Sequence, residues 1–261
     1  MYRDVKIVNE NMDFTRKIYK KLLEALKENG YSFYTFEEYC EGKAAGKFII
    51  LRHDVDSRAG HSVATAQVEA ALGIKASYYF RVVPQSDQPD KIKAIAALGH
   101  EIGYHYEDLS LLKGNTSLAI DHFAIRLTHF RKFYPVKTIC MHGSPTSKYD
   151  NRTIWKYYNY RDFSIIGEPY FDVNFNEIFY LTDTGRCWDG EKFSVRDKVN
   201  SAFKKTYHST NEIINAAKND TLPTKIMITT HPQRWTNNIF EWILEFILQN
   251  TKNIIKRLII K

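Results

Sequence analysis

The sequence has few cysteines and no long apolar run. Of its 261 residues only Cys40, Cys140 and Cys187 are cysteines, an odd number without metal-motif spacing. This count argues against a disulfide framework, so we expect reduced thiols and a cytoplasmic protein. The first residues carry charges and lack the apolar core of a secretory signal. No stretch is apolar over the roughly 20 residues that a membrane-spanning helix needs.

Acidic residues are outnumbered by basic ones. The chain has 30 Asp and Glu against 37 Lys and Arg, a net charge of +7. Such a balance favours anionic partners, for example a sugar phosphate, a lipid diphosphate or a membrane surface. The lysines, however, are scattered through predicted helices, which is typical of solvated helix faces. Because no basic patch accompanies a recognisable reading element, we expect no nucleic-acid partner.

Internal repeats and low-complexity segments are also lacking, and short apolar runs alternate with helical patterns instead. This alternation predicts an α/β fold, a distorted (β/α) barrel of about seven parallel strands. We expect a single domain over residues 1–261, with an N-terminal helical extension at 1–45. A long excursion at 143–200, rich in Tyr, Asn and Asp, is expected to cover one end of the barrel. The predicted strands are 47–51, 76–83, 100–105, 136–142, 163–167, 178–183 and 225–231. The predicted helices are 13–30, 57–74, 89–99, 117–133, 211–219 and 239–250.

Polar side chains follow five of these apolar runs, always at the end of the strand. In a parallel barrel all carboxyl ends of the strands lie on one face, where such enzymes keep their active sites. One histidine alone is more simply a hydrogen-bonded structural residue, and one aspartate alone a helix cap. Three histidine-bearing ends together with a paired-aspartate end favour a site. The strand ends carry Asp54 and Asp56, His105, His142, Asp183 and His231.

The chemistry of these residues suits a divalent metal ion. Imidazole and carboxylate groups are standard ligands for zinc and other first-row ions. Asp54 and Asp56 are two residues apart, so on an extended strand both face the same side. A catalytic site would use three protein ligands and activate a water molecule. An unligated carboxylate could then act as base, and a further histidine as acid for the leaving group.

Three motifs resemble those of the polysaccharide deacetylases with a NodB-homology domain, carbohydrate esterase family four. The segment LGHEIGYHYEDLS at 98–110 resembles the family's Gly-His-Glu-Ile-Gly-Asn-His motif. RHDVD at 52–56 resembles a divergent form of Thr-Phe-Asp-Asp-Gly, and IMITTHPQRW at 226–235 resembles the last motif. The resemblance covers roughly residues 46–236. It implies a metal-dependent barrel enzyme that removes N- or O-acetyl groups from sugars, with zinc as the first expectation and manganese, cobalt or nickel as alternatives.

The same resemblance implies roles for individual residues. Asp54 corresponds to the base, Asp56 and His105 to metal ligands, and His231 to the group that protonates the leaving group. Two departures stand out. Leu109 occupies the position of the family's second metal histidine, and MHGSP replaces its arginine motif. We infer that the third ligand is His142, with His53 and Glu107 as rivals.

The pattern also resembles a cytoplasmic subgroup found with surface-polysaccharide biosynthesis. The family resemblance implies an acetylated sugar as substrate, and because the first residues lack a secretory signal we expect a cytoplasmic precursor, a nucleotide sugar or a lipid-linked glycan precursor. Four residues are predicted to line the pocket wall, because aromatic faces stack on sugar rings and guanidinium groups bind phosphate or carboxylate. They are Arg186, Trp188, Arg234 and Trp235. Two other functions stay open: hydrolysis of a non-sugar amide, and a non-catalytic sugar-binding subunit.

The C-terminal stretch 239–261 is amphipathic, with basic residues near its end. Its simplest interpretation is a helix that closes the barrel, followed by a packed tail. The alternative is a surface helix that makes a weak peripheral contact with an anionic membrane.

Overall fold

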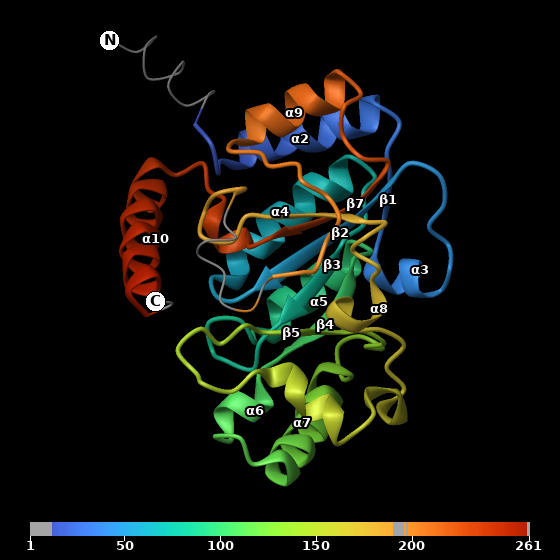
Figure 1. Cartoon of the computed structure of the whole chain (residues 1–261), viewed down its shortest axis with the longest axis vertical. Coiled ribbons are helices and arrows are strands. Elements are labelled where there is room, and N and C mark those ends of the chain that lie inside the picture. Colours follow the sequence, from blue (N-terminus) through green and yellow to red (C-terminus); the bar gives the residue numbers. More distant parts are fainter. Residues whose placement is uncertain (1–11, 190–195, 197, 260–261) are drawn as a thin grey trace.

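A parallel sheet of seven strands forms the centre of the protein. The computed structural model describes residues 12–189, 196 and 198–259 (Figure 1). The strand order is β5-β4-β3-β2-β7-β6, and β1 pairs with the first half of β2. Every pairing of these strands is parallel, which confirms the predicted α/β fold of about seven parallel strands. The strands are β1 (Ser32–Tyr34), β2 (Phe48–Val55), β3 (Ser77–Phe80), β4 (Glu101–Tyr106), β5 (Ile139–Met141), β6 (Phe179–Thr182) and β7 (Lys225–Thr230).

Two strand expectations differ from the structure. The apolar run at 163–167 is no strand, and only Gly167 forms an isolated bridge, with Thr138. Conversely, the segment 1–45, expected as a helical extension, contributes β1 to the sheet. β1 is only three residues long and polar at its start, so it has too few residues to show an alternating pattern.

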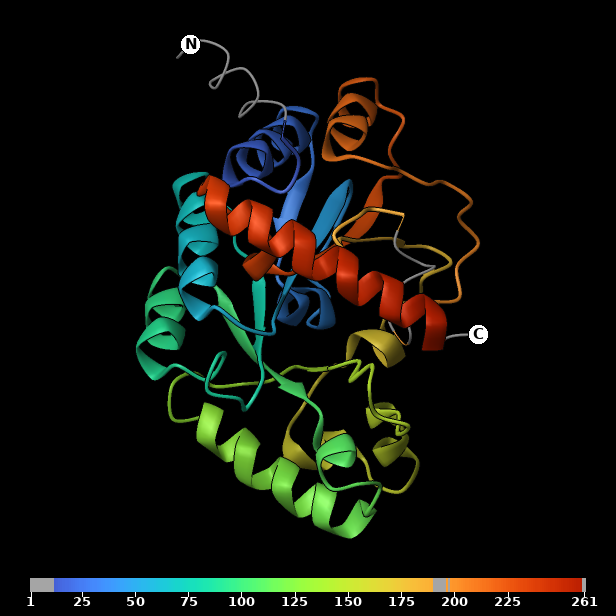
Figure 2. The same cartoon turned by 90° about the vertical axis from the view of Figure 1, so that its left-hand side faces the viewer.

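Helices cover the sheet and fill the connections between strands (Figures 1 and 2). α2 buries an apolar stripe that includes Ile18, Leu22 and Leu26, as its spacing predicts, and begins at the capping side chain of Thr15. None of the helices in the described ranges is both long and apolar enough to cross a bilayer. The helices are α2 (Arg16–Glu28), α3 (Phe36–Cys40), α4 (Ala59–Ala71), α5 (Pro89–Ala97), α6 (Asp108–Leu111), α7 (Thr116–Phe130), α8 (Pro169–Asp172), α9 (Thr210–Lys218) and α10 (Ile239–Ile259). The 3₁₀ helices are η1 (Asn151–Lys156), η2 (Tyr160–Phe163) and η4 (Pro232–Arg234).

The alternation of side chains along β2 separates two apolar clusters. Ile49 and Leu51 belong to the larger cluster, which the outer helices complete. Phe48 and Ile50 belong to a second cluster on the other face of the sheet. Because successive strand residues point to opposite faces, Asp54 continues the second face up to the end of the strand.

A buried polar network ties β2 to α2, α4 and β3. The carboxylate of Glu69 accepts hydrogen bonds from the hydroxyls of Tyr19 (2.5 Å) and Tyr78 (2.7 Å), and it pairs with His53 at 2.7 Å. All four side chains are almost fully buried. Glu69→Ala should therefore lower the free energy of unfolding by about 3 kcal/mol or more, because three buried polar groups lose their partner. Urea denaturation measures this, with Glu24→Ala on α2 as control; Glu24 is only partly buried and forms a surface pair with Lys20, so its loss should cost less than about 1 kcal/mol. A cost for Glu69→Ala no larger than that of Glu24→Ala would refute a structural role for the network.

Candidate metal centre and active site

The predicted site residues converge at the carboxyl ends of four strands. Asp54 lies on β2 and His105 on β4, while Asp56, His142 and His231 directly follow β2, β5 and β7. Oδ1 of Asp56 lies 3.7 Å from Nε2 of His105 and 3.6 Å from Nε2 of His142. Its Oδ2 lies 3.9 Å from Nε2 of His231. Three imidazoles thus direct the same ring nitrogen towards one carboxylate.

Hydrogen bonds on the far side of the rings fix the orientation of His105 and His142. Nδ1 of His105 lies 2.9 Å from the carbonyl oxygen of Cys140, and Nδ1 of His142 lies 2.9 Å from Oε2 of Glu107. A ring that donates its Nδ1 proton in this way presents the lone pair of Nε2, as metal-ligating histidines do. Burial lowers the pKa of His105 to about 4, so this ring is neutral at pH 7.

The donor set fits a divalent cation. Oδ1 of Asp56 is buried and has no hydrogen-bond partner among the described residues. A buried carboxylate oxygen without a partner is costly unless a cation or a proton donor meets it. Metal–ligand bonds near 2.0 Å in a tetrahedral site place donor atoms roughly 3.3 Å apart, close to the 3.6 and 3.7 Å separations from Asp56 to the two histidines. Asp56, His105 and His142 therefore have the chemistry of a three-ligand site, and Asp56 lies near ligand spacing from each of the two histidines.

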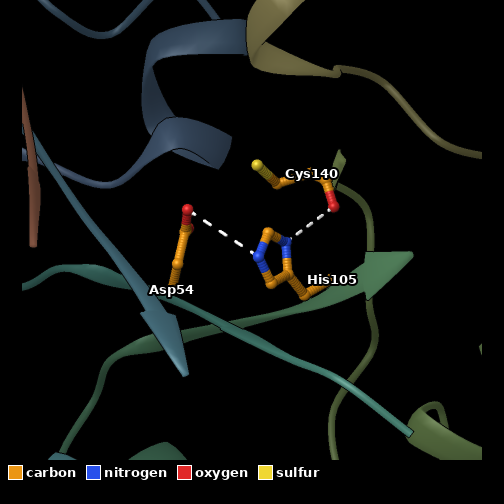
Figure 3. A group of neighbouring side chains, drawn as sticks. All are labelled: Asp54, His105 and Cys140. Carbon is orange, nitrogen blue, oxygen red and sulfur yellow. Dashed lines mark hydrogen bonds and ion pairs between the residues drawn. The ribbon is translucent and has the colours of Figure 1, made fainter. Parts of the chain in front are cut away.

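A second group of donors overlaps with this one. Asp54, His105 and Cys140 each place one ligand atom within 4.8 Å of the others (Figure 3). The carboxylate of Asp54 is already engaged by Arg52, and Cys140 belongs to the apolar cluster beneath the site. A thiol in that cluster offers a metal no open position for water. Cys140 does not line the cavity, whereas Asp56 does and has an unpartnered oxygen, which favours the set that contains Asp56.

The rival ligands named from the sequence occupy other positions. His53 points to the helix layer, where its ring pairs with Glu69 and with Oγ1 of Thr230. Glu107 stands behind His142 and also accepts two hydrogen bonds from Arg81, at 2.8 and 2.9 Å. Leu109, at the position of the missing histidine, is buried in the large apolar cluster. His142 thus lies beside Asp56 and His105, whereas His53 pairs with Glu69 on the other face of the sheet.

Arg52 holds the carboxylate of Asp54 through two hydrogen bonds. Nε donates to Oδ1 at 2.9 Å and Nη2 to Oδ2 at 2.6 Å, and both side chains are buried. Burial alone would raise the pKa of Asp54, but the Arg52 guanidinium and the neighbouring His105 outweigh it and lower that pKa far below its usual range. Asp54 is therefore a fully ionised, oriented carboxylate. The sequence motif contained Arg52, yet we assigned it no role; its position two residues before Asp54 on the strand is the signal.

His231 forms a second oriented pair, with Asp183. Nδ1 of His231 lies 2.6 Å from Oδ1 of Asp183, which also accepts a hydrogen bond from Nη1 of Arg234 at 2.7 Å. Oδ2 accepts a hydrogen bond from Nε1 of Trp235 at 2.8 Å. Burial and Arg234 would lower the pKa of His231, but Asp183 outweighs them and raises it. His231 is thus poised as a proton donor whose Nε2 faces Asp56.

A cavity of about 590 Å³ opens above these groups. Arg234 lines it, together with the basic residues Arg81, Arg196 and Lys252. The other three predicted wall residues do not line it. Arg186 stacks on Trp242 of α10, with 4.2 Å between the guanidinium carbon and the ring centroid. Trp188 and Trp235 are buried against each other beneath the site, where Trp235 supports Asp183.

Comparisons with known proteins find only distant similarity. No family model and no curated protein matches the sequence, whereas three chains of solved structures match. One is a wild-type CE4 family pseudoenzyme from Bacillus anthracis, with 10% identity and a TM-score of 0.43 over 79% of this chain and 61% of that chain. Another is a mutant of the peptidoglycan deacetylase PdaC from Bacillus subtilis, with 11% identity and a TM-score of 0.38 over 81% of this chain and 97% of that chain. The chain thus spans less than two thirds of the first protein's length, and neither likeness assigns an activity.

Proposed function

We propose that this chain is a divergent member of the polysaccharide deacetylase family, a metal-dependent hydrolase that removes an acetyl group from an N- or O-acetylated sugar. The observation that carries the proposal is the convergence of three Nε2 atoms on Asp56, at 3.6 to 3.9 Å. Each ring is held from behind by a carbonyl or carboxylate oxygen. Structural histidines of a core do not need a shared, unpartnered carboxylate oxygen in front of them.

The residues divide into a metal-holding group and two proton-transfer groups. Asp56, His105 and His142 would hold the ion, with zinc as the first candidate. A bound divalent ion supplies a Lewis acid for the acetyl carbonyl and lowers the pKa of a water molecule towards neutrality. Asp54 takes up the proton that this water loses when its oxygen attacks the carbonyl carbon. Burial would raise the pKa of Asp54, but the Arg52 guanidinium lowers it, so this carboxylate is ionised and able to accept a proton.

His231 completes the reaction at the leaving group. When the bond between the carbonyl carbon and the sugar nitrogen or oxygen breaks, the departing atom needs a proton. Protonated His231 provides it from Nε2, and Asp183 stabilises the imidazolium through Nδ1. Acetate and the free amino or hydroxyl sugar are the products. The basic side chains of the cavity would accommodate a phosphate or carboxylate on the substrate.

Metal content is the first test. The wild-type chain, purified without chelator, should contain about one divalent ion. Asp56→Ala, His105→Ala and His142→Ala should each lose most of it, because the loss of one of three ligands weakens the affinity for the ion. Elemental analysis by mass spectrometry measures the content. His129→Ala, which removes a surface histidine that pairs with Asp87, is the matched control and should retain the ion.

The outcomes separate the open assignments. Retention of metal by His142→Ala would contradict its role as ligand while sparing Asp56 and His105. Absence of metal from the wild type, even after addition of zinc, manganese or cobalt, would contradict the hydrolase and leave the sugar-binding subunit. Metal without acetate release from acetylated sugars would direct the search to non-sugar amides.

A further inference from the structure

The C-terminal helix α10 exposes its apolar face. Nine of the fifteen large hydrophobic side chains that are exposed in the described chain lie on this one helix. They include Phe240, 80% exposed, and Ile247 and Ile254, 55% and 59% exposed. The simplest interpretation from the sequence, a helix that closes the barrel, does not account for these exposed apolar side chains. A solvated apolar face of this extent marks a surface that binds an apolar partner.

The described side chains of α10 that are buried against the body of the protein are polar. Glu245, Gln249 and Asn253 form the buried stripe of the helix. The amide of Asn253 donates to the carbonyl oxygen of Gly185 at 2.8 Å, and Glu245 pairs with Arg58 at 3.6 Å. The helix is thus oriented by polar groups that face inward, which leaves its apolar side chains outward.

The same helix borders the mouth of the active-site cavity. α10 crosses the end of the sheet at which the strands finish (Figures 1 and 2). Gln249, Lys252 and Ile255 line the cavity beside the basic side chains Arg81 and Arg196. A surface that covers the apolar face of α10 would therefore lie next to the opening through which a substrate enters.

The charges around α10 suit an anionic surface. Its two acidic residues are engaged with the body, Glu245 with Arg58 and Glu241 with Oγ1 of Thr236. From residue 246 to 261 the sequence has four basic residues and no acidic one. An exposed apolar helix face in a sequence with several basic and few acidic residues is typical of helices that lie in the interface of an anionic bilayer.

We propose that α10 docks the protein on a bilayer that contains anionic lipid, with the cavity mouth at the membrane surface. This placement deepens, and rests on, the proposed hydrolase: the substrate is an acetylated sugar joined through a phosphate or diphosphate to a lipid. The lipid stays in the bilayer beside α10, the phosphate meets the basic residues at the mouth, and the acetyl group reaches His231 and Asp56 inside.

Vesicle co-sedimentation of the full chain tests the docking. The wild type should bind vesicles of phosphatidylcholine with phosphatidylglycerol, and bind phosphatidylcholine alone more weakly. The double variant Phe240→Ser/Ile247→Ser should bind about tenfold less well or worse, because each replaced side chain loses its transfer into lipid. The matched control is Leu118→Ser/Ile125→Ser on α7, which replaces side chains that are 54% and 64% exposed and should bind like the wild type.

Several results would overturn the docking. One is a wild type that binds neither vesicle, and another is a control variant that loses binding equally. A wild type that is dimeric in solution and becomes monomeric only in Phe240→Ser/Ile247→Ser would assign the face to a second copy of the chain. Since vesicle binding needs no metal, a wild type that binds vesicles but takes up no zinc, manganese or cobalt would keep the docking and contradict the hydrolase.

Acetate release tests the substrate class. For a lipid diphosphate-linked N-acetylated sugar in vesicles, Phe240→Ser/Ile247→Ser should release acetate about tenfold more slowly than the wild type, following its loss of binding. For a water-soluble N-acetylated sugar the two proteins should be equal, since neither replaced residue lines the cavity. Equal rates on the vesicle substrate would overturn the lipid-linked assignment.

Discussion

Asp54→Asn should lower kcat for acetate release about 10³-fold while the protein keeps its metal. Asparagine preserves the shape of the side chain but cannot take up the proton that the attacking water loses. General-base catalysis contributes roughly 10² to 10⁴ in rate. Asp54 is not among the residues assigned to hold the ion, so metal content should stay near that of the wild type. Initial rates at saturating substrate measure the loss of kcat, and the metal content of the same sample measures the retention of the ion.

A second variant distinguishes lost chemistry from lost structure. Asp54→Asn leaves the buried guanidinium of Arg52 without its counter-charge, and removing one partner of such a pair costs about 3–5 kcal/mol. The double variant Arg52→Met/Asp54→Asn removes both charges and should recover much of that stability. Its kcat should stay as low as that of the single variant. A kcat within tenfold of the wild type in either protein would show that Asp54 is not the base.

The position of the site was predictable because the ends of the apolar strand runs and the period of two along a strand are both visible in the local sequence. Strand runs predict where strands end, and parallel pairing places those ends on one face. These two rules suffice to place Asp56, His105, His142 and His231 close together from the sequence alone. The period of two also predicts the partner of Asp54, because Arg52, two residues earlier on the strand, lies on the same face.

The pocket wall and the surface were harder to predict because they depend on distant partners. Trp188 and Trp235 have the residue type of sugar-stacking platforms, yet each finds a buried hydrogen-bond acceptor, Thr210 and Asp183. Periodicity showed that 239–259 has an apolar face but not which side meets the protein. The orientation of the helix depends on polar contacts such as that of Asn253 with Gly185, which is 68 residues away in the sequence.

Asp183→Asn should lower kcat by about 10³ to 10⁴ through its effect on His231, without removing the metal. Asp183 fixes the ring through Nδ1, and the corresponding substitution in hydrolases with an Asp–His pair has an effect of this size. Asp183 also raises the pKa of His231 against the effects of burial and Arg234. His231 acts as a donor only when protonated, so kcat falls as the pH rises through this pKa.

In Asp183→Asn that fall should begin at a lower pH, because the charge that raised the pKa is gone. A pH profile of kcat, on protein with verified metal content, measures the displacement. Asp108→Asn is the matched control: Asp108 is equally buried and pairs with His122 at 2.5 Å, but lies outside the cavity lining. Its pH profile should coincide with that of the wild type. If Asp183→Asn lowered kcat without shifting its pH profile, Asp183 would act by positioning Trp235 and Arg234 and not by raising the pKa of His231.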